Sequence, residues 1–221
     1  MKFPNAHNGV KKIFTAEILS LIGTVVLVVA AILALAAGGM ISTGAADQAV
    51  EQTTGIVAGA GLFGLVGGIL MIVAFILNLV GIISAKKDEG SFSTALTFTI
   101  VGIAASLLAG LFANNAMMSD LAQIITNFAQ MMVAYYVVQG IANLAVRLHN
   151  PAMVERGNQV RMYLMIAYCI PIVVNFLSMI FSMREKSFVA EALGLTALIL
   201  SLVVYFIYLG YLSKAKKMLE G

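Results

Sequence analysis

The chain has 221 residues, of which 61% are hydrophobic and only 10% are charged. Soluble globular domains carry about 25% charged residues, so this composition excludes an ordinary soluble protein and indicates a membrane protein. The formal net charge of +3 is too small to indicate a nucleic-acid surface. We therefore expect the lipid bilayer, and no nucleic acid, as a partner.

Few residues in the sequence suit metal or redox chemistry. The single cysteine, Cys169, lies within an apolar interval, so it is expected to behave as a buried hydrophobic side chain. His7 and His149 are too far apart in the sequence to form a known metal-binding motif. We expect no metal site and no cofactor.

Six intervals of the sequence contain no Asp, Glu, Lys or Arg. They are residues 18–46, 52–85, 90–119, 121–146, 162–183 and 192–213. Each exceeds the ~20 apolar residues that cross a ~30 Å hydrocarbon layer, and in lipid such segments must be helices. The sequence predicts an all-α polytopic membrane protein with six transmembrane helices in three in-out-in hairpins. The expected spans of this single domain, residues 1–221, are 16–38, 56–84, 93–114, 121–146, 162–183 and 189–212.

The positions of the basic residues predict the orientation, because cytoplasmic loops are enriched in Lys and Arg. With six spans and a cytoplasmic N-terminus, every basic residue except Arg184 and Lys186 lies on the inner side. If the fourth interval did not span, seven basic residues would lie inside and six outside. Six spans are therefore favoured. The sequence predicts a plasma-membrane protein with both termini cytoplasmic and an inner polar loop from His149 to Arg161.

The first two helices carry stripes of small residues at every fourth position. The apolar run of the first helix follows Lys11 and Lys12 and in this respect resembles a secretory signal. Its 20 residues are longer than a usual signal core, which favours an intact helix over a cleaved signal. Stripes of small residues let helices pack closely, within one hairpin or against a partner subunit or a second copy. The stripe residues are Ala30, Ala34 and Gly38 in the first helix and Ala60, Gly64 and Gly68 in the second.

The fourth and fifth helices carry polar side chains at matching depths. We expect these residues to line a polar patch that binds a small molecule, or else to hydrogen-bond between the two helices. They are Gln123, Asn127 and Gln130 in the fourth helix and Asn175 and Ser178 in the fifth. Pro171 is expected to bend the fifth helix nearby.

The inner half of the fourth helix is polar on the opposite face, at Tyr136, Gln139, Asn143 and Arg147. A helix that is polar on two faces is expected at the centre of the bundle. Tyr211 in the sixth helix is expected either to meet this lower face or to anchor the helix at the membrane interface.

The sequence lacks the residue clusters that catalysis requires, so we expect no enzyme. The leading hypothesis is a membrane protein that binds or translocates a small uncharged or weakly polar molecule through the polar patch. The alternative is a non-catalytic adaptor or assembly subunit that packs against a partner protein through the Gly and Ala stripes.

Overall fold

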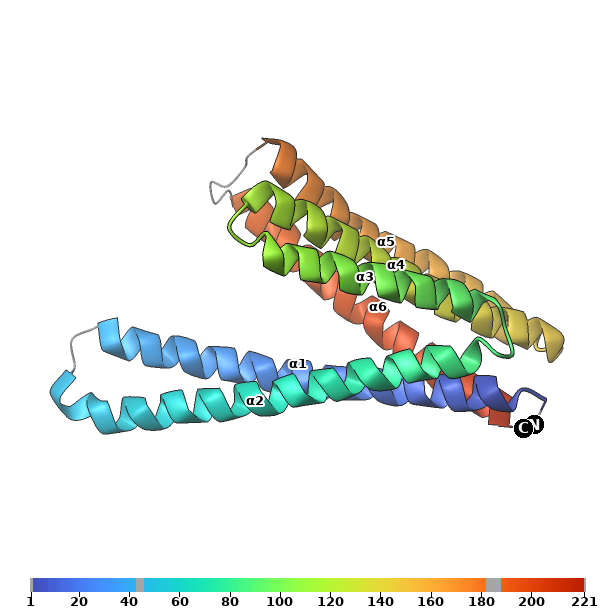
Figure 1. The fold of residues 1–221 in the computed structure, drawn as a ribbon, viewed down its shortest axis with the longest axis horizontal. Helices are drawn as coiled ribbons and strands as arrows, with labels where there is room; N and C mark the ends of the chain where they lie inside the picture. The colour runs from blue at the N-terminus through green and yellow to red at the C-terminus, as the bar shows by residue number, and fades with distance from the viewer. Residues whose placement is uncertain (1, 43–45, 182–187, 221) are drawn as a thin grey trace. The chain divides into compact units, whose positions relative to one another are not determined.

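The computed structural model describes the backbone of residues 2–42, 46–181 and 188–220, and the side chains of residues 2–37, 56–115, 117–170, 172–173 and 200–220. The described residues form six helices and no strand (Figure 1). They are α1 (Pro4–Ser42), α2 (Ala46–Ala85), α3 (Ser91–Leu111), α4 (Ala116–Arg147), α5 (Pro151–Phe181) and α6 (Phe188–Glu220). This part of the chain is therefore all-helical, as the sequence predicts.

Four described segments are long and apolar enough to cross a membrane. They are Pro4–Ala37, Ile56–Ala85, Ser91–Leu111 and Met117–Arg147. Many of their large hydrophobic side chains are exposed, for example Leu35 in α1 and Leu65 in α2. In water such surfaces would be unfavourable, whereas hydrocarbon can cover them. These features are those of a membrane protein.

The chain folds into two compact units, Met1–Lys11 with Gly81–Gly221 (unit 1) and Lys12–Val80 (unit 2). In unit 2, α1 and α2 pack closely through glycine. A side chain added at Gly67 would lie 2.8 Å from Leu27 Cγ, and one at Gly23 would lie 3.2 Å from Met71 Sδ. Glu17 also accepts a hydrogen bond of 3.2 Å from the Asn78 amide. Small residues therefore hold this hairpin together, as is usual where lipid removes the hydrophobic drive between helices.

In unit 1, α4 packs against both α3 and α5, and the Tyr211 hydroxyl of α6 donates a hydrogen bond of 3.5 Å to the carbonyl oxygen of Val138. Within unit 1, α4 therefore lies between α3 and α5. The largest fully buried side chains of the unit lie at one end, which we call the terminal end (residues 4–11, 81–95, 137–161 and 204–220; Figure 1). They are Val10, Ile82, Phe92, Val137, Val138, Ile141, Leu144, Val160, Tyr211 and Leu212.

Glycines allow the close packing of the terminal end. A side chain at Gly140 would lie 2.6 Å from the Phe92 ring, and one at Gly157 would lie 2.7 Å from the Tyr211 hydroxyl. Tyr211 itself is fully buried. Tyr211 meets α4 at Val138, which is not one of the residues of the expected polar face, and its full burial does not fit an anchor at the membrane interface.

The inner loop expected from His149 to Arg161 is much shorter in the structure, because α5 begins at Pro151. The Asn150 side chain caps this helix by accepting a hydrogen bond of 3.2 Å from the amide of Met153. Proline suits the first helical position, where its missing N–H costs nothing. Arg161 consequently lies well inside a helix and not in a loop.

Candidate functional site

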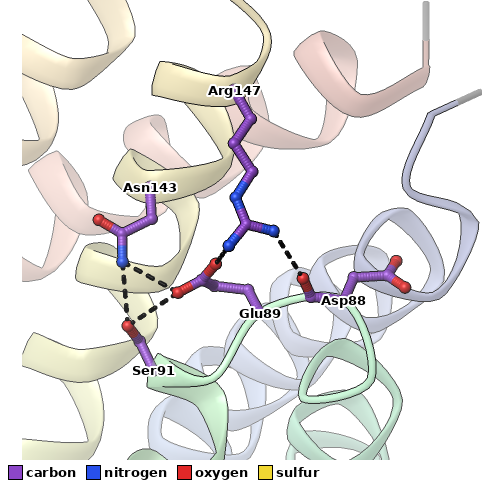
Figure 2. Close-up of polar contacts among 5 residues, drawn as sticks. All are labelled: Asp88, Glu89, Ser91, Asn143 and Arg147. Atoms are coloured by element: carbon purple, nitrogen blue, oxygen red, sulfur yellow. Dashed lines mark hydrogen bonds and ion pairs between the residues drawn. The ribbon is translucent and has the colours of Figure 1, made fainter.

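The terminal end of unit 1 carries a polar cluster built around the buried carboxylate of Glu89. One oxygen, Oε2, lies 2.8 Å from Arg147 Nη2. The other, Oε1, accepts hydrogen bonds of 3.0 Å from the Asn143 amide and 3.3 Å from the Ser91 hydroxyl. Figure 2 shows these contacts between the α2–α3 loop, the start of α3 and the end of α4. A buried carboxylate with this many donors is fixed in position, and its buried oxygens are not left without partners.

Asp88, the residue before Glu89, reaches the start of α1. Its Oδ2 accepts a hydrogen bond of 2.7 Å from the backbone amide of Ala6, and its Oδ1 accepts one of 3.0 Å from the Asn5 side chain. Amides in the first turn of a helix have no partner within the helix, and negative charge is favoured there. Asp88 therefore caps α1 from a loop distant in the sequence.

The cluster formed by Asp88, Glu89, Ser91, Asn143 and Arg147 joins the beginning of α1 to α3 and α4. Arg147 adds a hydrogen bond of 3.2 Å to the carbonyl oxygen of Asp88 (Figure 2). Both carboxylates are occupied by protein donors, so the arrangement is suited to holding helix ends together. It offers no free base for proton transfer.

The described residues of the predicted polar patch all lie on α4. Gln123 and Gln130 are exposed and Asn127 is half-buried. The Gln123 amide donates a hydrogen bond of 3.1 Å to Asn127 Oδ1 within the helix. The neighbouring face of α4 packs against α3. On this face, the Thr126 hydroxyl lies 3.4 Å from the Ser106 hydroxyl of α3. The side chains of Asn175, Ser178 and Pro171 lie outside the described residues, so their juxtaposition with α4 stays a prediction.

The predicted stripes lie beside the contact between α1 and α2. Ala30 is buried, whereas Ala34 is exposed and Ala60 is half-buried. A side chain added at Gly64 or Gly68 would meet no atom within 4 Å, while Gly67 faces Leu27. Gly38 lies outside the described side chains. The contact between α1 and α2 is thus made by Gly67, and not by the predicted stripe residues Gly64 and Gly68, whose side of α2 is open.

Arg161 is a second charged group of interest, on α5. Its guanidinium lies over the ring of Tyr135, 5.3 Å from the centroid, and donates to the Asn158 side chain. Its Nε atom is buried and has no hydrogen-bond acceptor in the described structure. Tyr135 in turn packs against Tyr136, and Tyr136 stacks on Phe98. Aromatic side chains therefore surround one side of this charge.

Sequence reasoning missed the roles of Glu89 and Arg161 because both border charge-free intervals and read as loop residues. One available signal was the pair Asn150 and Pro151, which is typical of a helix cap followed by the first helical residue. It would have placed Arg161 three turns into a helix. The contact of Glu89 with Arg147 has no comparable signal, because it joins residues 58 positions apart.

Among the described residues, no group of three or more His, Cys, Asp or Glu side chains could hold a metal ion. Comparisons of the chain with protein-family models, with curated proteins and with solved structures found no match.

Proposed function

We propose that the chain is a plasma-membrane protein with six spans in three in-out-in hairpins and both termini in the cytoplasm. The distribution of basic residues supports this topology, because Arg184 and Lys186 alone would lie outside. Reporter fusions that are active only in the cytoplasm test it at the N-terminus, at the C-terminus and after Asp120. Activity is expected at both termini and not after Asp120, and termini on opposite sides would contradict the topology.

Within the membrane, we propose a non-catalytic adaptor or assembly subunit that packs against another membrane chain through α2. The observation that carries this proposal is the open face at Gly64 and Gly68, beside the glycine that α1 covers. Small residues on a lipid-exposed helix allow a second helix to approach closely. The partner is a second copy or a different subunit.

Cysteine cross-linking in native membranes tests this role. Cys169 is the single cysteine of the chain, and it is exposed, so the expectation of a buried side chain is wrong. Cys169→Ala gives a background without thiols. In that background, Gly64→Cys and Gly68→Cys are expected to form cross-linked species on oxidation. Leu62→Cys is the matched control, since Leu62 is also exposed but lies on a different face of α2. Equal cross-linking at positions 62 and 64, or none, would contradict the proposed interface.

A second candidate function is the binding of a small, uncharged or weakly polar molecule by Gln123, Asn127 and Gln130 with Asn175 and Ser178. It is favoured by the exposure of Gln123 and Gln130, because exposed amides on a membrane helix are costly unless water, ligand or protein meets them. Thermal-shift screening of purified protein against uncharged polar compounds tests it. Shifts are expected for the wild type and not for Asn127→Leu or Asn175→Leu. Shifts unchanged in both variants would remove these residues from the site.

A further inference from the structure

Arg161 lies deeper in unit 1 than its place in the sequence indicates. α3 has 21 residues, which cover ~31 Å and match the ~30 Å hydrocarbon layer. When α3 spans this layer, its first residue, Ser91, marks the boundary, and Ser91 accepts a hydrogen bond from Asn143 of α4. Tyr135 lies two turns of α4 beyond Asn143, ~12 Å further into the layer. The guanidinium of Arg161 lies over the Tyr135 ring and is therefore well inside the boundary.

A charge at this depth needs a counter-charge. Moving a cation out of water is unfavourable unless it is paired, and charged groups within membrane helices mark functional sites by default. Arg147 meets this need with Glu89, 2.8 Å away. Among the described residues, no carboxylate is within ion-pair distance of Arg161. The Asn158 carbonyl and the Tyr135 ring supply partial charges only, and the buried Nε–H has no acceptor.

We propose that Arg161 binds a phosphate group between α4 and α5. A guanidinium presents N–H donors in a planar fork that matches phosphate oxygens. A phosphate would therefore supply the negative charge that no described carboxylate supplies to Arg161. The guanidinium is directed back along α5 toward Asn158, which lies nearer to the start of that helix at Pro151. That is the direction from which the phosphate of a phospholipid headgroup, or a soluble phosphate, reaches it. The site is formed by residues of α4 and α5, so the proposal does not depend on the adaptor role of α2.

Thermal unfolding of the purified full-length protein in a neutral detergent tests the site. The probes are phosphatidylglycerol, inorganic phosphate and sodium chloride at matched ionic strength. The wild type is expected to gain several degrees in Tm with one phosphate-bearing probe and not with chloride. A shift with phosphatidylglycerol alone assigns the site to a lipid headgroup, and a shift with inorganic phosphate assigns it to a soluble anion. Absence of any shift beyond that of chloride overturns the proposal.

Two variants on α5 localise the effect. Arg161→Gln is expected to lose the shift, whereas Arg156→Gln removes the same charge from the same helix and is expected to keep it. If both variants behave alike, the effect is one of net charge and the proposal fails. Arg161→Lys keeps the charge but loses the fork, so it provides a test even if Arg161→Gln does not fold. Its affinity for the phosphate probe is expected to fall about 10-fold, and an unchanged affinity overturns the proposed geometry.

Discussion

Arg147 Nη2 lies 2.8 Å from Glu89 Oε2 and thereby joins the last turn of α4 to the loop before α3. The two side chains differ in their surroundings, since 53% of the Arg147 side chain is exposed but only 7% of Glu89. A released Arg147 can turn toward water, whereas a released Glu89 stays buried. The cost of breaking the pair therefore depends on which partner is removed.

Arg147→Ala is expected to destabilise the protein more than Glu89→Gln. Removal of Arg147 leaves a buried carboxylate without its counter-charge, at a cost of about 1–3 kcal/mol. Glutamine at position 89 keeps the shape of the side chain and an oxygen for the Asn143 amide, so its cost is expected to be about 1 kcal/mol or less. Unfolding of the single and double variants in detergent measures both costs and their coupling. A larger loss for Glu89→Gln would contradict this account of the pair.

The contacts of the glycines predict a graded series of alanine variants. At Gly9, an added Cβ would lie 2.5 Å from the backbone oxygen of Gly81, which cannot move aside easily. Gly9→Ala is therefore expected to cost about 1–3 kcal/mol, as overpacking usually does. Gly140→Ala meets the Phe92 ring at 2.6 Å and is also expected to destabilise.

Gly64→Ala is the matched control for this series, because its Cβ would meet nothing within 4 Å. Its effect on the unfolding of the isolated protein is expected to be neutral or a gain of up to about 1 kcal/mol, because alanine is favoured over glycine within a helix. Unfolding midpoints in detergent give the order directly. A loss for Gly64→Ala as large as that for Gly9→Ala would show that the described packing does not govern stability.

The helical class could be predicted because long charge-free intervals are easily seen in a sequence, and a helix satisfies all the backbone hydrogen bonds of such a segment internally. Helix ends were harder to predict. A charge-free interval marks the part of a helix that can lie in lipid, but the helix itself can begin well before that interval. α5 illustrates this, since it starts at Pro151 and the charge-free interval starts at residue 162.

The least predictable feature was which side of each helix contacts its neighbour. The small residues of α2 occur at several registers, and sequence alone could not select Gly67 over Gly64 as the residue that meets α1. In the sequence, Tyr211 is equally consistent with a place at the membrane interface and with a place in the core. The structure shows that it is buried, in a space that the missing side chain of Gly157 leaves open. The Glu89 cluster depends on loops and helix ends that meet only in three dimensions, so its members could not be paired in advance.

Asp88→Ala is expected to loosen the first turn of α1. Asp88 accepts hydrogen bonds from the Ala6 amide and the Asn5 side chain, and loss of a capping residue costs about 0.5–2 kcal/mol. Asp88→Asn keeps an acceptor oxygen but loses the charge, so its effect is expected to be smaller. Hydrogen exchange of the amides of residues 5–8 measures the effect locally. Unchanged exchange at Ala6 in Asp88→Ala would contradict the capping role.

His149→Gly is expected to stabilise the junction between α4 and α5. His149 has φ 54°, in the left-handed region where a side chain is strained and glycine is not. Around it, the backbone amide of Asn150 donates a hydrogen bond of 2.9 Å to the carbonyl oxygen of Ala145. The backbone amide of His149 donates one of 3.0 Å to the carbonyl oxygen of Val146. This is the Schellman pattern of a helix end, and glycine is the usual residue at its left-handed position. The free energy of unfolding is expected to rise by about 1 kcal/mol.

His149→Ala is the control for this change, because it also removes the imidazole but keeps the Cβ that causes the strain. It is expected to leave stability unchanged or slightly lower it. The difference in unfolding free energy between the glycine and alanine variants isolates the backbone contribution from any contact of the imidazole. Equal stability of the two variants would mean that the helix end relaxes out of the left-handed conformation, and Asn150 would then lose its bond to Ala145 without cost.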